Sequence, residues 1–586
     1  MASSEDSSRH VRRAGDLRAV ARGHRGILAV ALVALFPLFA NLGAGTLWAD
    51  EADTAVFARS ILKAGLPTAW DGTTFTDSDS GRRLAPNLVL VGTPWVPYYV
   101  TAASLALFGE TSFAARFPFA VAGLATLLLL YALVLRLTGD RLAAVLSSGL
   151  LLSSVQFLIY VRQSRHYALN MLLSVGLLFA FQRLERRRPD PLFIALAVLL
   201  YHCHPMPAGV TLAVLGGLTL LSAFRAARWG FWLSFPLIVL LTAPWAVLAA
   251  QGWGENSRAL GVASDYVPRF VQFLYEASVA VPFVGLLVLA PFAARQLGAR
   301  DRRFLTLAVA VLAGYALLAP LAQSTLQLWE YGLRYSNAFL PLGAAVTALL
   351  IARAARGKRA VAIWIAALFA CTHLPGNTAL WMLIPPRPAP EERPAEPRAA
   401  LHMPAHAIDE ILRTEVLAFA RELVAWSPGT DSRIVAFLEK NAKPGDIVVT
   451  NYAWEPLYFH TRLPQGYKVM ESHSIYAAAK AAGLPAYVYE PDEARWLVWR
   501  APWEDYQGYR WAEVAARLRA AGGTLQPVAT FPETVWENRE NLHFRRFPVA
   551  GYLYPRAVET AYPAARIWRV DHAVAPAADP AAVIPR

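Results

Sequence analysis

Charged residues are scarce in this sequence. Only 17% of its 586 residues are Asp, Glu, Lys or Arg, whereas 56% are hydrophobic and the mean hydropathy is +0.35. Soluble domains carry about 25% charged residues, so the composition excludes an ordinary soluble globular protein. Cysteine is nearly absent too. The chain has only Cys203 and Cys371, which predicts packing residues rather than a disulfide or a cysteine-based metal site.

Charge is rarer still in several hydrophobic runs of about twenty residues, the length that a helix needs to cross a bilayer. These runs include Ile27–Gly45, Phe117–Leu135, Leu142–Tyr160, Gly230–Ala250 and Val361–Leu383. The net charge of +13 does not indicate nucleic-acid binding, because the Lys and Arg residues gather between the runs. The sequence therefore predicts an α-helical polytopic membrane protein.

The short loops between hydrophobic runs are rich in arginine, which predicts that they lie in the cytoplasm. They cover Arg183–Arg188, Arg225–Arg228, Arg295–Arg303 and Arg353–Arg359. Two hydrophobic segments separate each of these loops from the next, as is required if all the loops lie on the same side of the membrane. Counting crossings backwards places the turn Arg162–His166 on the outer side and the basic N-terminus on the inner side.

The segment Asn87–Phe108 carries Pro94 and Pro97, so we expect a juxtamembrane or re-entrant helix there. The chain then has about 11 spans, and a full crossing by this segment would make about 12. No small-residue cleavage site follows the first hydrophobic run, which predicts a retained signal anchor. We expect a multi-pass protein of the inner (plasma) membrane.

The composition changes after the last hydrophobic run. The predicted division is a cytoplasmic basic tail over 1–26, a transmembrane domain over 27–384 with a first outer loop over 46–112, a Pro-rich linker over 385–400, and an extracytoplasmic α/β domain over 401–586. In the last domain, helices are expected over 431–441 and 510–521, a turn followed by a buried strand over 443–450, and strands over 495–500, 525–531 and 541–547. No glycine-rich phosphate loop occurs in that part of the sequence.

Ionisable and tyrosine side chains gather on the predicted outer side of the membrane. Polar groups near a bilayer are costly and favour a functional role. The set comprises Asp50, Glu51, Asp53, Arg59, Asp71, Arg162, Arg165, His166, Tyr167, His202, His204, Glu255, Asp265, Tyr266, Glu330, Arg334 and Tyr335. The shared side, rather than any single motif, makes this set a candidate site.

One chemistry needs both the carboxylates and the arginines. Transfer of a sugar from a lipid phosphate requires a carboxylate that takes the proton of the acceptor hydroxyl. It also requires cations that hold the phosphate while its charge grows. Asp50 or Glu51 would be the base, and the outer arginines would bind the phosphate.

Each of these residues also has a structural interpretation. Asp50 and Glu51 would favour the N-terminus of a helix that follows Trp48. The arginines of the outer turn could be interfacial residues, and Arg334 could begin a helix. The His202-Cys-His204 spacing rarely supplies two metal ligands from one helix. No metal site is therefore predicted, although a divalent metal stays open as a cofactor.

Several of these motifs together resemble family 39 of the GT-C glycosyltransferases, which includes protein O-mannosyltransferases and the lipid A aminoarabinose transferase. The stretch from Trp48 to Arg59 resembles the opening signature of the family. Further similar segments are 93–100, 107–118, 160–167 and 334–341. The resemblance covers about residues 25–385, and the C-terminal part has only a general likeness to outer domains of bacterial relatives.

The resemblance implies a GT-C fold and an inverting transfer from a polyprenyl-phosphate-linked sugar to an acceptor protein, lipid or glycan. It gives Asp50 the position of the essential first-loop aspartate, with Glu51 beside it. The positions that line the donor phosphate site correspond to Arg162, Arg165, His166 and Arg334. The substrate cavity is expected to include Arg59, Tyr98, Tyr167 and Tyr335.

The chain departs from the family pattern at two places. Gly92-Thr93 stands before Pro94, where several bacterial members have an acidic-basic pair, so a metal or lysine–phosphate contact does not carry over there. The outer turn has His166-Tyr167 instead of an aspartate after its arginine.

Two other classes of protein remain alternatives. A transporter or flippase for a lipid-linked or anionic substrate would show internal repeats and charged helices, but the sequence has no repeat and its spans are almost free of charge. A membrane scaffold would use its outer domain to recruit partners and would not need the first-loop carboxylates.

Overall fold

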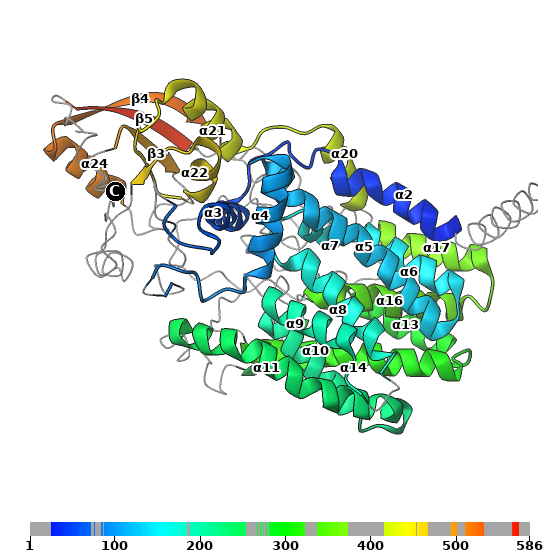
Figure 1. Cartoon of the computed structure of the whole chain (residues 1–586). Coiled ribbons are helices and arrows are strands. Elements are labelled where there is room, and N and C mark those ends of the chain that lie inside the picture. Colours follow the sequence, from blue (N-terminus) through cyan, green and yellow to red (C-terminus); the bar gives the residue numbers. More distant parts are fainter. Residues whose placement is uncertain are drawn as a thin grey trace, which may run out of the picture.

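The computed structural model describes residues 25–71, 76, 84–85, 87–184, 188–253, 266–267, 270, 273–274, 277, 281–322, 337–372, 415–452, 454–466, 494–500, 510–532 and 565–572. Within these residues the chain forms a bundle of helices and a smaller α/β domain beside one end of the bundle (Figure 1).

The bundle is built from apolar helices in chain order. They are α2 (Arg25–Phe39), α5 (Ser112–Thr138), α6 (Arg141–Ser153), α7 (Val155–Val161), α8 (Tyr167–Phe181), α9 (Pro191–Cys203), α10 (Pro205–Leu218), the 3-10 helix η1 (Ser222–Ala227), α11 (Arg228–Trp253), α13 (Phe283–Ala294), α14 (Ala299–Ala322), the 3-10 helix η4 (Asn337–Phe339), α16 (Leu340–Ala354) and α17 (Arg359–Cys371).

Local sequence signals set the ends of these helices. Gly139 adopts φ +73°, a left-handed conformation that favours glycine, and ends α5. The carboxylate of Asp140 then accepts the backbone N–H groups of Leu142 and Ala143 and starts α6. Asp190 caps α9 in the same way, with Pro191 in its first turn.

Within the described residues, four helices are long and apolar enough to cross a membrane, and a fifth span results if α6 and α7 count as one broken helix with a 73° bend. Seven shorter apolar helices of 10–17 residues accompany them. The chain is therefore a multi-pass membrane protein, as predicted. The number of spans, about 11 from the loop charges, stays a prediction.

Two helices of the predicted first outer loop lie across one end of the bundle. These are α3 (Ala49–Ala64) and α4 (Val96–Phe108), and Figure 1 shows α4 running across the direction of α5 rather than beside it. The sequence led us to expect a short helix over 87–108 that does not span, and the structure has a 13-residue helix there. Its depth relative to a membrane stays a prediction.

An ion-pair cluster joins loops at the other end of the bundle. Arg353 donates two hydrogen bonds to Asp301, from Nε at 2.8 Å and Nη2 at 2.9 Å, and one from Nη1 to Asp140. Arg353 and Asp301 belong to two of the arginine-rich segments that we expect in the cytoplasm, and Asp140 lies in the turn between α5 and α6. They therefore share one end of the molecule.

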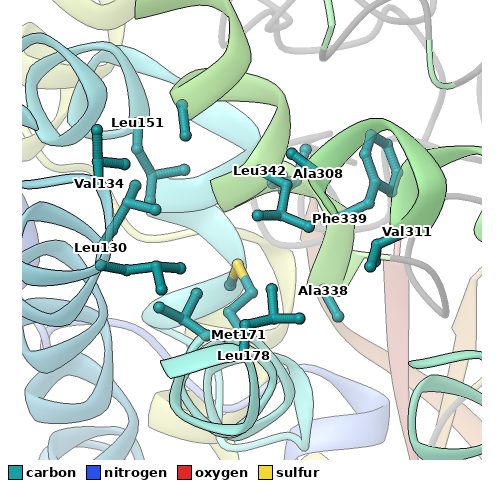
Figure 2. Close-up of a cluster of buried hydrophobic side chains, with 14 of the residues drawn as sticks. Leu130, Val134, Leu151, Met171, Leu178, Ala308, Val311, Ala338, Phe339 and Leu342 are labelled. Atoms are coloured by element: carbon teal, nitrogen blue, oxygen red, sulfur yellow. The ribbon is translucent and has the colours of Figure 1, made fainter. Parts of the chain in front are cut away.

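Aliphatic side chains fill the space between the bundle helices. Figure 2 shows Leu130 and Val134 of α5 and Met171 of α8 among the side chains of one such cluster, which also receives Val311 of α14 and Leu342 of α16. At Gly123 and Gly314 a neighbouring valine lies so close that a Cβ atom would overlap with it, a close approach that small residues allow in membrane bundles.

The smaller domain contains a five-stranded sheet with the order β2-β1-β3-β5-β4. Strand β1 is parallel to β2 and β3, whereas β5 is antiparallel to β3 and β4. The strands are β1 (Val448–Thr450), β2 (Gln465–Gly466), β3 (Trp496–Arg500), β4 (Gly523–Phe531) and β5 (Ala565–His572), and the helices are α20 (Glu415–Val424), α21 (Thr430–Asn441), α22 (Glu455–Thr461) and α24 (Trp511–Ala520).

Five of these elements, α21, α24, β1, β3 and β4, lie within or close to the ranges that the sequence predicts. The sequence did not predict α20, α22, β2 or β5, and the expected strand over 541–547 lies outside the described residues. A buried ion pair helps to hold the sheet to α21: Arg500 Nη1 lies 2.6 Å from Asp431 Oδ1. The extracytoplasmic location of this domain stays a prediction, and the Pro-rich linker over 385–400 lies outside the described residues.

Candidate active site

The first-loop carboxylates lie in the first turn of α3. Acidic residues are favoured there because the free N–H groups of a helix start carry partial positive charge. The side chain of Glu51 accepts the backbone N–H of Trp48 at 3.3 Å, and Gly65 ends the helix with φ +77°. Glu51 therefore does stabilise the start of a helix, and both carboxylates have further contacts.

Glu51 is completely buried and bound on both oxygens. Arg116 of α5 donates from Nε at 2.9 Å to Oε1 and from Nη2 at 2.6 Å to Oε2. The backbone N–H of Ser164 donates to Oε1 at 2.9 Å. This carboxylate therefore ties α3 to α5 and to the predicted outer turn.

Sequence reasoning missed Arg116. The residue also donates to the carbonyl oxygens of Leu42, Gly45 and Thr46, so it orders the chain before α3 as well. Arg116 does lie in the segment 107–118 that carries the family resemblance. That segment was the signal that could have identified it.

Asp50 differs from its neighbour, because its side chain is 30% exposed and faces Arg165. Arg165 Nη2 lies 3.4 Å from Asp50 Oδ2, and its Nη1 lies 3.5 Å from Asp53 Oδ2. Arg165 also donates to the Asp50 carbonyl and to Thr54 Oγ1. The structure thus brings together the predicted base and one predicted phosphate ligand.

Burial alone would lower the pKa of Arg165. The negative charge of Asp50, with Tyr98, Tyr167 and Asp53, raises this pKa instead, above its ordinary value. The guanidinium therefore stays charged at every pH of interest, as binding to a phosphate requires.

Three further predicted site residues lie around Arg165. Tyr98 and Tyr167 are close enough to influence its charge. The ring of His166 lies 4.5 Å from that of Tyr167 and 4.8 Å from that of His204. Arg334 and Tyr335 lie outside the described residues, so their roles stay predictions.

Arg162 points away from this group. It donates to the carbonyl oxygens of Pro37, Leu38 and Ala40 at 2.9–3.0 Å, at the C-terminal end of α2. A cation is favoured at a helix C-terminus. Arg162 and Arg165 thus do not converge on one point, although they are three residues apart.

A cavity of about 70 Å³ lies on the Arg162 side of Glu51. It is lined by Glu51, Arg116, Arg162 and Gln163 and is covered by the segment from Phe419 to Ser432. The amide of Gln163 is buried and has no hydrogen-bond partner within the described part of the chain. A cavity of this size has room for a few water molecules.

Arg59 lies at the contact with the smaller domain. Its Nε is 2.9 Å from Glu110 Oε2 and its Nη2 donates to the carbonyl of Phe459 at 2.8 Å. Nearby, Tyr458 donates to Asp71 at 2.5 Å. The structure therefore gives Arg59 contacts across a domain interface, and its predicted place in a substrate cavity stays a prediction.

The comparisons with known proteins agree with the motifs. A model of the family described as dolichyl-phosphate-mannose-protein mannosyltransferase matches residues 92–248. The predicted resemblance is confirmed over this segment. The match contains Tyr98, Arg116 and the outer turn at 162–166, whereas Asp50 and Glu51 precede it. No curated protein sequence matches the chain.

Solved structures match over almost the whole chain. ArnT from Cupriavidus metallidurans bound to undecaprenyl phosphate matches with a TM-score of 0.55 and 15% identity, covering 95% of this chain and 99% of that one. Its apo structure matches with a TM-score of 0.54 and 16% identity, covering 87% and 96%. Identity at this level shows the fold, which confirms the predicted GT-C class.

Among the described residues, no three His, Cys, Asp or Glu side chains form a group that could hold a metal ion. The site as described offers a half-exposed carboxylate, a buried and charged guanidinium, and aromatic and imidazole rings around them.

Proposed function

We propose that the protein is a membrane glycosyltransferase that moves a sugar from a polyprenyl-phosphate carrier to an acceptor on the extracytoplasmic face. The observation that carries this proposal is the pairing of Asp50 with Arg165 at the end of the bundle that carries α3 and α4. It combines an accessible carboxylate with a permanent cation, which are the two groups that the reaction needs.

In the proposed reaction, Asp50 takes the proton of the acceptor hydroxyl as its oxygen attacks the anomeric carbon. The bond from that carbon to the phosphate oxygen breaks, and the phosphate leaves with its electron pair. Attack opposite the leaving group inverts the configuration. Arg165, with His166 beside it, stabilises the charge that grows on the phosphate.

The remaining predicted residues take supporting roles in the proposal. Glu51 and Arg116 hold the start of α3 so that Asp50 faces Arg165. Arg162 anchors the turn to the end of α2. Arg334 is proposed as a second phosphate ligand, on the strength of the family resemblance alone.

The fold comparison supports a polyprenyl phosphate donor, because the solved ArnT structure that matches this chain is bound to undecaprenyl phosphate. The family model adds support through its description as a mannosyltransferase that uses dolichyl phosphate mannose.

The test replaces Asp50 with Asn, which keeps the size of the side chain and removes its basicity. A general base contributes about 10²–10⁴ to a rate, so we expect transfer from labelled undecaprenyl-phosphate sugars to membrane acceptors to fall by about 100-fold or more. Asp53→Asn is the matched control, since Asp53 also faces Arg165 but has no role as base. Full transfer by Asp50→Asn, at equal expression, would overturn the proposal.

A further inference from the structure

Two helices carry rows of polar residues from the candidate active site into the bundle. On α8, Asn170 and Ser174 follow His166 at intervals of four, so all three share one face of the helix. On α10, Thr211 lies about two turns beyond His204 on a common face. The rings of His166 and His204 lie 4.8 Å apart at the beginning of both rows.

Two further residues complete the group. The hydroxyl of Tyr315, from α14, lies close to those of Ser174 and Thr211. Asn337 belongs to η4, which packs against α8 and α14. We name Asn170, Ser174, Thr211, Tyr315 and Asn337 the polar seam; all five residues are buried.

Among the described residues, the two amides of the seam lack partners, and its hydroxyls contact only one another. Both side-chain amide atoms of Asn170 and Asn337 make no hydrogen bond within the described part of the chain, whereas the hydroxyls of Ser174 and Thr211 lie within hydrogen-bonding reach of Tyr315. Buried groups of this kind destabilise a fold unless something satisfies them. Few compensating partners exist inside a membrane domain, where such residues usually mark a functional site.

Hydroxyls elsewhere in the bundle behave differently. Ser147 donates to the carbonyl of Ala143, and Thr126 donates to that of Ala122, each four residues earlier in its own helix. This bond is also available to a serine or threonine in α8 and α10, yet Ser174 and Thr211 do not make it. Their orientation toward Tyr315 is thus a specific arrangement.

The chemistry of the seam limits what can occupy it. Amides and hydroxyls both donate and accept hydrogen bonds, and none of the five side chains is charged. A matching ligand is neutral and carries several hydroxyl groups. Because a helix rises 1.5 Å per residue, Ser174 lies about 12 Å along the axis from His166, so the seam extends directly inward from the Arg165 end.

We propose that the polar seam binds the sugar of the lipid-linked donor while the donor phosphate lies at Arg165, and that it selects a neutral monosaccharide. This inference rests on the proposed function. An amino sugar or a sugar acid would place a charge among side chains that cannot neutralise it, which is costly in a buried site. The seam therefore favours hexoses or pentoses without ionisable groups.

The experiment compares donors with and without their sugar. Full-length protein in nanodiscs is titrated with undecaprenyl phosphate and with undecaprenyl-phosphate-linked mannose, glucose, galactose and 4-amino-4-deoxy-arabinose. In the wild type, at least one neutral donor should bind about tenfold or more tightly than undecaprenyl phosphate, and the amino sugar should show no such gain. Absence of a gain for every neutral donor, or a larger gain for the amino sugar, would refute the inference.

Three variants then locate the sugar. Tyr315→Phe, Thr211→Val and Ser174→Ala each remove a hydroxyl and little else, so each should reduce the gain due to the sugar by about fivefold to tenfold. Affinity for undecaprenyl phosphate alone should not change. Thermal stability should change by no more than one hydrogen bond contributes, about 0.5–1.5 kcal/mol, because the lost hydroxyl contacts only another hydroxyl of the seam. Ser147→Ala, whose hydroxyl is bonded to its own helix, is the matched control and should keep the full gain.

The result contradicts the inference if the gain survives in all three variants, as it would if the seam held only water. A parallel loss of affinity for undecaprenyl phosphate alone also contradicts it, because the seam would then bind no sugar specifically. Binding is measured without turnover, so this test can fail while Asp50→Asn still abolishes transfer. The inference and the proposed function therefore fail separately.

Discussion

Asp50 and Glu51 are neighbours in the sequence but have opposite environments. Glu51 is enclosed and bound by Arg116 and by the backbone of Ser164, whereas Asp50 is partly open to solvent beside Arg165. A base must be able to reach the substrate. The contacts therefore favour Asp50 as the base and a positioning role for Glu51.

This difference predicts that Glu51→Gln acts mainly on stability. The substitution leaves Arg116 charged and without its carboxylate, and breaking a buried pair costs about 3–5 kcal/mol. The thermal midpoint of the purified protein should fall clearly. Arg116→Met should lower the free energy of unfolding less when it is added to Glu51→Gln than when it is made in the wild type, because the double variant has no unpaired buried charge.

The same variant separates the two roles of Glu51 when kcat is measured on the folded fraction. A positioning role predicts a kcat within about tenfold of wild type at low temperature. A loss of 100-fold or more with an unchanged thermal midpoint would instead make Glu51 a base, since that is the range of general-base effects.

The residues around Asp50 and Arg165 show which contacts can be predicted from the sequence. Loop charges predicted a shared side for Asp50 and Arg165, and the two residues do meet. The direction of Arg162 could not be read from the sequence, because it depends on where α2 ends in space. Arg116 was missed because its partner lies 65 residues away and its position within α5 gives no sign that it faces Glu51.

At the scale of elements, helix ends were the most predictable feature. Gly139-Asp140 and Asp190-Pro191 act through their own backbone conformation, so they work in the same way in any fold. In the smaller domain, α21, α24, β1, β3 and β4 also follow local patterns, whereas α20, α22, β2 and β5 were not predicted. The broken helix at Ser154 and the crossing direction of α4 depend on packing between helices, which local patterns do not contain.

Packing between elements depends on Gly123 of α5. A Cβ atom at this position would lie 2.7 Å from Cβ of Val161 in α7, with both Val161 methyl groups within 3.0 Å. Because α7 leads directly into the turn that carries Arg165, we expect Gly123→Leu to shift this turn. Overpacking of this kind costs typically about 1–3 kcal/mol, and sugar transfer should decline with stability.

Gly149→Leu is the control for this prediction. Gly149 lies in α6, and a Cβ atom there would have no neighbour within 4 Å. Both variants gain helix propensity equally, so a difference between their thermal midpoints reports the contact with Val161. Equal midpoints and equal transfer rates would show that α7 adapts and that the close approach has no consequence.

At the scale of the whole molecule, the smaller domain and the predicted first outer loop form one unit. Trp454, Tyr458 and Phe459 of the domain pack into the apolar cluster around α3. Glu110 links Arg59 and Arg462 across the same boundary. The domain therefore braces the helix that carries Asp50, an arrangement that no local sequence pattern could reveal.

His460 makes this interface sensitive to pH. Its Nε2 accepts the backbone N–H of Leu47 at 3.2 Å, so the ring must be neutral there. Burial first, and then the positive charges of Arg116 and Arg59, lower the pKa of His460 from 6.5 to about 4. The stabilising contribution is therefore present above pH 6.5 and is lost as the pH falls from 6.5 toward 4.

We accordingly expect the thermal midpoint to decrease below pH 6.5. Protonation of this one group lowers the free energy of unfolding by up to about 1.4 kcal/mol per pH unit. Hydrogen exchange of residues 455–461 should increase over the same interval, because the domain releases α3.

His460→Gln should weaken the interface at pH 7.5 and flatten the pH dependence, since Gln does not titrate. His572→Gln, in β5 of the same domain, should leave the dependence intact. A wild-type exchange rate that stays constant from pH 7.5 to pH 4.5, after correction for the intrinsic rate, would show that protonation of His460 does not control the docking of the domain on α3.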